Sequence, residues 1–433
     1  MVLTVLLSIV AVALMFICVL KFPVLKVGKY KFDSFYIPLT FVALILLIFP
    51  IFDKVEFFSI LFSNSALNPL KILILFICVS VLSIFLDETG FFGYIATVFI
   101  KKYKDSQFKL FATLYVIVSI LTVFTSNDII ILTFTPFIIH FSRKGNINPI
   151  PYLVMQFVAA NTWSMALSIG NPTNIYLSSI FNIGFFDYFL KMIIPAVLCG
   201  IASFLALFLL FRKTLKKKIE VFDLEETKIN NKFLCVTSLI HLSITIVLLA
   251  LSNYVDLEMY IICLIFSISL LIFFLFYSIK SKDYRYVKSG LKRIPYSLIP
   301  FILSMFTIIM ALDSYGVFES VYKALSTISN DGLQPIIYLI TSTLSCNVVN
   351  NIPMSLAYGS ILSNTTNIDL VYASIIGSNL GALLTPIGAL AGIMWVRMLK
   401  GEEIKYNFVD FMKNGSVLTL VLTVTASISL LII

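Results

Sequence analysis

Charged side chains are scarce in this chain. Asp, Glu, Lys and Arg make up 12% of its 433 residues, whereas 60% are hydrophobic and the mean hydropathy is +1.02. Soluble globular domains carry about twice that charged fraction, so this composition excludes them. The apolar residues stand in continuous runs rather than in alternation, which excludes a membrane β-barrel. The sequence therefore predicts an all-α polytopic membrane protein, long enough for about ten spans of roughly 20 residues.

Side chains for catalysis or metal binding are also few. The chain has two histidines, and its six cysteines are scattered without metal-ligand spacing. It contains no GxxxxGK[ST] phosphate loop and no readable Ser/His/Asp set. We therefore expect no enzyme, no cofactor and no metal site. Coupling energy would come from an H⁺ or Na⁺ gradient, or from a separate ATPase subunit. The net charge of +9 indicates membrane orientation rather than nucleic-acid binding.

A polar segment interrupts the apolar sequence near residue 126. Thr125-Ser126-Asn127-Asp128 stands between apolar limbs at 108–124 and 129–141. Each limb is short for a hydrocarbon core of roughly 30 Å, so the pattern predicts a re-entrant hairpin. Such backbone is tolerated only where protein or a water-filled cavity surrounds it. Asp128 would then be an ionisable group deep in the membrane, which indicates a functional role.

The second half of the chain repeats the landmarks of the first. Leu86-Asp87-Glu88-Thr89-Gly90 resembles Leu312-Asp313-Ser314-Tyr315-Gly316 at an offset of 226, and Pro172 and Pro386 are offset by 214. A second polar tip, 345–351, follows the first by a similar interval. Five spans per copy is an odd number, so the second copy must be inverted, which is typical of secondary transporters.

The predicted organisation is a first inverted repeat at 1–211 with a hairpin at about 108–141, a cytoplasmic loop at 212–232, and a second repeat at 233–433 with a hairpin at about 336–362. The full spans expected are 2–20, 34–52, 72–86, 150–169, 188–211, 233–251, 259–277, 294–312, 370–395 and 417–433.

The basic residues indicate the orientation of this arrangement. With the N-terminus outside, 27 of the 31 Lys and Arg residues fall in segments on the inner side. The four exceptions are Lys54, Lys71, Lys191 and Lys323. Such an asymmetry predicts that both termini lie outside a cell membrane and that the 212–232 loop is cytoplasmic. The first hairpin then enters from the cytoplasm and the second from outside, so that their tips can meet.

Four polar breaks are predicted to converge: the two tips and the interruptions at 170–174 and 377–388. Side-chain oxygens and freed carbonyls there suit Na⁺ or a small polar solute, and half-helix N-termini add positive charge. The alternative is that Pro and Gly only kink the helices while Asn caps them. The candidate binding residues are Ser126, Asn127, Asp128, Asn171, Thr173, Asn174, Asn347, Asn350, Asn351, Ser378, Asn379, Thr385 and Gly388.

Asp128 is the candidate for the coupling proton, because it is the acid of the two tips and its counterpart is Asn351. The alternative is an Asp that caps the hairpin. We expect Asp87, Glu88 and Asp313 to cap the short helices that follow them. His241 is expected to be a satisfied scaffold histidine, and Cys346 to be a small buried residue rather than a soft ligand.

At these residues the sequence resembles the arsenite efflux permease (ArsB-type) family of the ion transporter superfamily, which also holds citrate, dicarboxylate and sodium/proton carriers. Where dicarboxylate carriers tend to have Ser-Asn-Thr, this chain has Ser-Asn-Asp at 126–128. The matching stretches are Leu86–Phe92, Asn127-Asp128, Ala160-Asn161-Thr162, Asn350-Asn351-Ile352-Pro353, and Leu384–Leu390 with Trp395.

The resemblance implies an elevator transporter and a homodimer, with a scaffold made of the first two spans of each repeat and its last. The leading functional hypothesis is proton-coupled efflux of arsenite or antimonite, which are neutral trihydroxides. No Lys or Arg occurs at 110–142 or 324–396, as a neutral solute requires. The alternatives are a Na⁺-coupled di- or tricarboxylate transporter and a Na⁺/H⁺ antiporter. A structural membrane protein would instead carry apolar residues at the breaks.

Overall fold

The computed structural model describes the chain except residues 23, 28–29, 50–53, 64–67, 103–105, 218, 220–227, 252–256, 329–330, 364 and 433. Helices dominate the described part. A small antiparallel hairpin of β1 (Val24–Val27) and β2 (Tyr30–Asp33) follows the first helix, with Val24 opposite Asp33. The sequence analysis did not predict these strands, because four residues are too short for an alternating pattern to stand out.

The helices of the first half begin with α1 and end with the long α10. Their bounds are α1 (Val2–Lys21), α2 (Ile37–Ile48), α3 (Lys54–Phe62), α4 (Pro69–Glu88), α5 (Phe91–Lys102), α6 (Gln107–Phe124), α7 (Asn127–Lys144), α8 (Ile150–Trp163), α9 (Pro172–Ile180) and α10 (Phe185–Leu215), with 3₁₀ turns η1 (Ser164–Ala166) and η2 (Ser168–Gly170) between α8 and α9.

The second half follows a similar order. Its helices are α11 (Lys232–Ala250), α13 (Met259–Ser281), α14 (Arg285–Arg293), α15 (Leu298–Asp313), α16 (Val317–Ser326), α17 (Gln334–Val349), α18 (Asn351–Ile361), α19 (Ile368–Gly381), α20 (Leu390–Gly401) and α21 (Phe408–Leu430), with 3₁₀ turns η3 (Asp331–Leu333) and η4 (Pro386–Gly388).

Local signals set many helix starts. The side chains of Asn68, Asn231 and Asn407 each accept a hydrogen bond from a backbone N–H in the first turn of α4, α11 and α21. After α4 and α15 the chain turns through Gly90 (φ 84°) and Gly316 (φ 68°), a left-handed conformation that favours glycine. In both halves a short helix, a pair of helices, an interrupted helix and a long helix follow this turn. The inverted orientation of the halves stays a prediction.

Several spans differ from those expected. Eight helices of the described chain are long and apolar enough to cross a membrane. The α6 limb is one of these, with 18 residues, so its re-entrance stays a prediction. The α2 helix ends at Ile48, earlier than expected, and α10 and α21 extend beyond the predicted bounds. The expected spans at 150–169 and 370–395 are interrupted, because α8 ends at Trp163 and α19 ends at Gly381.

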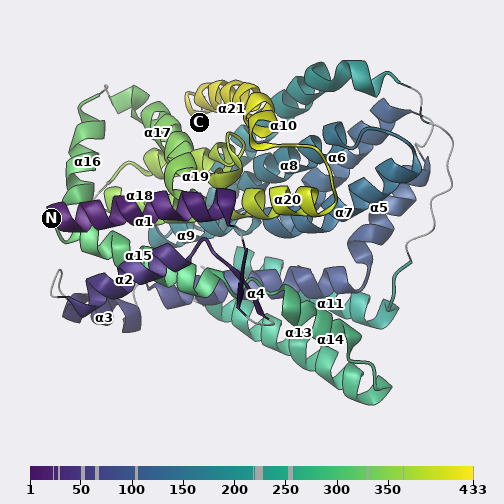
Figure 1. Cartoon of the computed structure of the whole chain (residues 1–433), viewed down its shortest axis with the longest axis horizontal. Helices are drawn as coiled ribbons and strands as arrows, with labels where there is room; N and C mark the ends of the chain where they lie inside the picture. The colour runs from purple at the N-terminus through teal and green to yellow at the C-terminus, as the bar shows by residue number, and fades with distance from the viewer. Residues whose placement is uncertain are drawn as a thin grey trace.

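The helices form two bodies, which lie one above the other in Figure 1. The lower one, called here the α4 body, contains α2, α4, α11, α13, α14 and α15; α4 packs on α13 and α11, and α15 packs on α2. The upper one, called the hairpin body, contains α6–α10 and α17–α21; α17 packs on α19, α8 on α6 and α7, and α10 on α21. Helix α1 crosses the front. The bodies meet where α15 contacts α18 and α4 contacts α7.

This packing differs from the scaffold grouping that the resemblance implied. Helices α10 and α21 pack mainly on the interrupted helices and on each other, not on the first two spans of their own halves. Small residues explain the difference. A Cβ on Gly200 of α10 would lie 2.4 Å from the Trp163 ring, and a Cβ on Gly415 of α21 would lie 2.2 Å from the Leu383 carbonyl oxygen. Both long helices therefore fit closely against the ends of α8 and α19.

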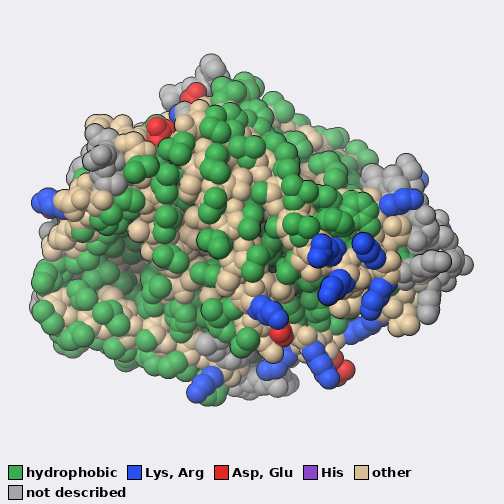
Figure 2. Space-filling model, turned by 90° about the horizontal axis from the view of Figure 1, so that it is seen from above, with side chains coloured by type: hydrophobic (Ala, Val, Ile, Leu, Met, Phe, Trp, Pro, Cys, Tyr) green, Lys and Arg blue, Asp and Glu red, His purple; other side chains and the backbone are tan. Residues whose placement is uncertain are grey.

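Basic side chains gather toward one end of the molecule, at the right in Figure 2, whereas hydrophobic side chains cover its middle. Ion pairs join segments that are distant in the sequence. Arg143 pairs with Glu402 at 2.8 Å, and Lys191 pairs with Asp369 at 3.2 Å. In each pair both partners lie in segments that the predicted topology places on the same side.

Candidate functional site

The interruption of each broken helix begins with residues that cannot continue a regular helix. Asn171 is extended, and its side-chain oxygen accepts from the Thr173 backbone N–H, while Pro172 begins α9. Thr385 is also extended and precedes Pro386 of η4. Proline lacks the N–H that a helix needs, and it is tolerated at a first turn. The breaks therefore span 164–171 and 382–389, somewhat shifted from the predicted 170–174 and 377–388.

Asn379 of α19 is the centre of a hydrogen-bond network that joins the two halves. Its Oδ1 accepts from Ser164 Oγ at 2.8 Å and from Asn171 Nδ2 at 2.9 Å. Its Nδ2 donates to Asn174 Oδ1 at 2.7 Å and to the Ile375 carbonyl oxygen at 2.8 Å. These partners lie more than 200 residues away, apart from Ile375. The side chain of Asn379 is fully buried, so water cannot reach it and protein groups satisfy its polar atoms instead.

A second contact between the halves lies beside Asn379. Thr173 Oγ1 and Ser378 Oγ are 2.9 Å apart. Asn174 donates to the carbonyl oxygens of Ser164 and Leu167, both within the first break. The two interrupted helices are thus held together by neutral amides and hydroxyls.

The first tip connects to this network through Asn161 of α8. Asn127 Nδ2 donates to Asn161 Oδ1 at 3.1 Å. Ser164 Oγ also lies 2.9 Å from the Asn161 carbonyl oxygen, so its one proton is shared between that oxygen and Asn379 Oδ1. The Asp128 backbone N–H donates to Asn127 Oδ1 at 2.9 Å. Among the described residues, no hydrogen bond or ion pair reaches the Asp128 carboxylate. Its oxygens are therefore available for an ion or a solute.

The second tip closes on the break before α20. Asn350 has φ 77° and donates to the Ile387 carbonyl oxygen at 2.8 Å. Asn347 donates to the Gly381 carbonyl oxygen at 3.0 Å and accepts from Thr385 Oγ1 at 2.7 Å. A Cβ on Gly388 would lie 2.6 Å from the Gly381 oxygen, so glycine is needed for this approach. Asn351 Oδ1 is buried without a hydrogen-bond partner among the described residues. Asp128, at the equivalent position of the first tip, is partly buried.

The structure therefore places the predicted residues in one connected region. Asn171, Thr173, Asn174, Ser378 and Asn379 contact one another directly, whereas the two tips connect to them through α8 and α19. No hydrogen bond joins the two tips directly among the described side chains. The sequence analysis missed Asn161 and Ser164 as members of the site. Asn161 precedes Asn379 by 218 residues, so the repeat offset could have found it.

Gly377 tests how tightly α19 packs against α17 in this region. A Cβ there would lie 1.9 Å from Ser342 Oγ and 2.7 Å from the Leu339 carbonyl oxygen. Gly377→Ala is therefore expected to lower stability by about 1–3 kcal/mol, the usual cost of overpacking. Thermal unfolding of the detergent-purified protein measures this. Gly401→Ala, where nothing lies within 4 Å of the added atom, is the matched control and should leave the unfolding temperature unchanged.

The capping roles expected for three acidic residues are wrong. Asp87 and Glu88 belong to the last turn of α4 and pair with Arg293 at 2.6 and 2.8 Å. Gly316 occupies the N-cap of α16, and no side chain caps that helix, so Asp313 does not. An acid near a helix start is locally ambiguous, and here a distant arginine decides its role.

The remaining polar candidates act in packing. His241 lies between the Thr237 carbonyl oxygen, at 2.8 Å, and Ser269 Oγ, at 3.0 Å, as a scaffold histidine should. Cys346 is fully buried, with its sulfur near the carbonyl oxygens of Gly377 and Ser378. Both residues behave as the sequence predicts.

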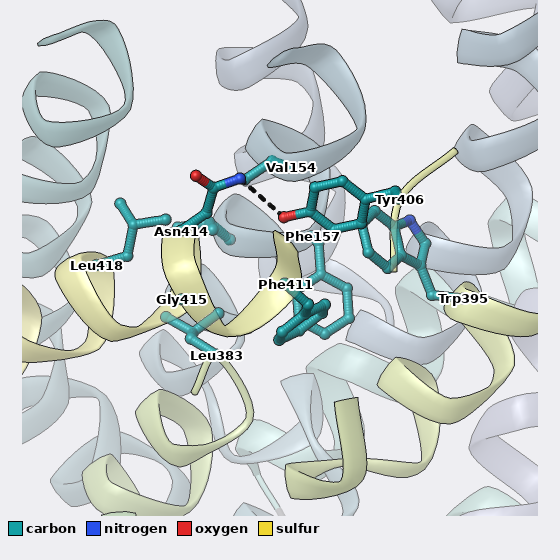
Figure 3. A pocket seen from close by; sticks show the side chains of 10 residues that line it. Val154, Phe157, Leu383, Trp395, Tyr406, Phe411, Asn414, Gly415 and Leu418 are labelled. Atoms are coloured by element: carbon teal, nitrogen blue, oxygen red, sulfur yellow. Dashed lines mark hydrogen bonds between the residues drawn. The ribbon is translucent and has the colours of Figure 1, made fainter. Parts of the chain in front are cut away.

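An aromatic pocket lies beside the second break, separate from the polar centre (Figure 3). The Trp395 ring contacts the rings of Phe157 and Phe411 at 5.1 and 5.8 Å between centroids. Asn414 Nδ2 donates to the Tyr406 hydroxyl at 2.9 Å, as the dashed line shows. The other lining residues are apolar, apart from the buried Nε1 of Trp395, which has no hydrogen-bond partner among the described residues. The pocket lies where α20 and α21 pack on α8.

Paired helical hairpins and interrupted helices around a buried polar centre define the class of this protein as a secondary transporter in the membrane. A family model described as citrate transporter matches residues 1–371, so the chain belongs to that family.

Two named relatives and one solved structure are similar to this chain. The arsenical pump membrane protein of Escherichia coli K12 is 27% identical over 363 residues, covering 80% of this chain and 82% of that protein. The putative arsenical pump membrane protein of Bacillus subtilis is 22% identical over 382 residues, covering 80% and 84%. The YdaH transporter of Alcanivorax borkumensis has a similar fold, with a TM-score of 0.57 at 12% identity and coverage of 100% and 97%.

Proposed function

We propose that this protein exports arsenite or antimonite from the cell in exchange for protons. The observation that carries the proposal is a pair of tip groups, the Asp128 carboxylate and Asn351 Oδ1, that accept no hydrogen bond from the described residues and border the buried network of neutral amides and hydroxyls around Asn379. Arsenite is a neutral trihydroxide at pH 7, so it needs hydrogen-bonding groups and no fixed cation. The two relatives described above, named as an arsenical pump membrane protein and a putative one, support the same solute class.

The chemistry of Asp128 supports coupling to a cation. A carboxylate without a protein cation must be neutralised by an ion when it crosses the low-dielectric region, and H⁺ and Na⁺ are the two candidates. We take H⁺ as the coupling ion and the two bodies as the parts that move against each other. The proposal places the protein in the plasma membrane with both termini outside, as a homodimer, with the 212–232 loop open to an ATPase partner.

A second candidate is Na⁺-coupled uptake of a di- or tricarboxylate. The family description, citrate transporter, favours it, and half-helix N-termini could hold carboxylates. An anionic solute near Asp128 would however meet a like charge unless that side chain were protonated or bound to Na⁺. A Na⁺/H⁺ antiporter would need only Asp128.

Transport into membrane vesicles tests these alternatives. Energised everted vesicles that contain the protein are expected to accumulate arsenite several-fold above vesicles that lack it, and a protonophore should abolish the difference. Citrate and succinate should not accumulate. If everted vesicles do not accumulate arsenite while right-side-out vesicles take up a carboxylate upon Na⁺ addition, the proposed solute and the proposed coupling ion are both wrong. The second candidate, a Na⁺-coupled carboxylate transporter, is then supported.

A further inference from the structure

Polar contacts join the hairpin body to the α4 body at two places. Thr133 Oγ1 of α7 donates to Asp87 Oδ2 of α4 at 3.0 Å. Arg397 Nη1 of α20 donates to Asp33 Oδ1 at 2.9 Å, at the end of β2, the strand that leads into α2 of the α4 body. The ion pairs Arg143–Glu402 and Lys191–Asp369, by contrast, each connect helices within the hairpin body.

An arginine fixes the position of Asp87, the acceptor of the Thr133–Asp87 hydrogen bond. Arg293 at the end of α14 pairs with both Asp87 and Glu88, whose side chains are only 12% and 11% exposed. Helix α14 packs closely on α4 at Gly290. A Cβ at this position would lie 2.7 Å from the Phe85 ring, so the two helices approach at a distance that only glycine permits. The Asp87 carboxylate therefore has a fixed orientation, and one of its oxygens can accept the hydrogen bond from Thr133 of α7.

The second contact lies over an incompletely filled seam. The β1–β2 arm returns the chain from α1 to α2, and Ser34 Oγ ties it to the Phe22 carbonyl oxygen. Asp33 and Arg397 themselves line a small pocket between the end of the arm, the start of α15 and α20, whose other lining residues are Val19, Phe35, Ser297, Leu390, Ile393 and Met394. The other lining side chains are apolar apart from Ser297, so the ion pair is the charged contact of this pocket.

We propose that Thr133–Asp87 and Arg397–Asp33 form a latch that holds the hairpin body against the α4 body in the conformation seen here. Asp33, Asp87, Arg293 and Arg397 all lie in segments that the predicted topology places on one side. The latch rests on the proposed function, since it has a role only if the two bodies move during transport. Its opening would release the hairpin body toward the alternate conformation.

Accessibility of the seam tests the latch without any solute. Ser297→Cys places a thiol in the seam pocket, and a Cys18→Ser background removes the half-exposed native cysteine. The rate of labelling by a bulky maleimide is measured on the full-length purified protein in detergent. Arg397→Gln and Thr133→Val are each expected to raise this rate about two- to fivefold, the change in population that one exposed ion pair or hydrogen bond supports.

Two variants separate the latch from a general loosening. Arg143→Gln removes an ion pair of similar exposure inside the hairpin body and should leave the labelling rate unchanged. The charge swap Asp33→Arg with Arg397→Asp should return the rate to that of the parent protein. The latch is overturned if Arg397→Gln labels no faster than Arg143→Gln, or if the swap fails to restore slow labelling. These outcomes are independent of whether arsenite is the solute, because none is present.

Discussion

Asp128→Asn is expected to abolish proton-coupled transport while the protein folds normally. The substitution keeps the size and shape of the side chain but removes the group that can bind H⁺. No described residue bonds to the Asp128 carboxylate, so no protein contact is lost. The second tip already carries an amide, Asn351, at the equivalent position. Arsenite uptake by energised everted vesicles should fall to that of vesicles without the protein, and thermal unfolding should be unchanged.

A counterflow assay sharpens this result. If Asp128 carries only the proton, vesicles loaded with unlabelled arsenite should still exchange it for labelled arsenite in the variant, since exchange needs no net proton movement. Asp283→Asn is the matched control. A hydrogen bond from the Arg285 side chain lowers the pKa of Asp283 to about 2, so this acid stays charged throughout the assay. Uptake by Asp128→Asn that remains sensitive to a protonophore would assign the coupling to another residue.

The local features of this fold could be predicted from sequence because their signals are local. Polar tips between apolar limbs marked the two helix pairs, and Pro172 and Pro386 marked the interruptions to within several residues. Proline and asparagine act on the backbone within one turn, so their effect does not depend on distant partners. The repeat offsets then suggested which positions in the two halves correspond.

Distant contacts could not be predicted in the same way. The roles of Asp87 and Glu88 depend on Arg293, which is about 200 residues away, and a local rule assigned them to caps. The grouping of α10 and α21 depends on Gly200 and Gly415, which permit close packing, whereas hydropathy makes all apolar spans look alike. The sequence identified Asn379 and Asn171 as site residues, but it did not predict the hydrogen bond between them.

Asn379→Leu is expected to prevent stable folding. The change leaves Asn171 Nδ2 and Asn174 Oδ1 without their partner in a fully buried region, whereas Ser164 Oγ can still donate to the Asn161 carbonyl oxygen. Each unsatisfied buried group costs about 1–3 kcal/mol, so the loss from these two groups is about 2–6 kcal/mol. Size-exclusion chromatography after a temperature series should show loss of the monodisperse peak well below the wild-type temperature. Ser378→Ala, which removes the contact with Thr173, should cost only about 0.5–1.5 kcal/mol.

The hydrogen bonds of Asn379 indicate a structural role for this residue, whereas the two tips are the candidates for solute binding. Both polar atoms of Asn379 are occupied by protein partners, so none remains for a solute. A milder variant, Asn379→Ser, should therefore lower the unfolding temperature while arsenite affinity in the folded fraction stays constant. Asn351 Oδ1 has no hydrogen-bond partner among the described residues. Asn351→Leu should therefore lower the affinity for arsenite while the unfolding temperature stays constant. A change of affinity in Asn379→Ser at constant stability would instead place the solute directly on the amide that joins the two halves.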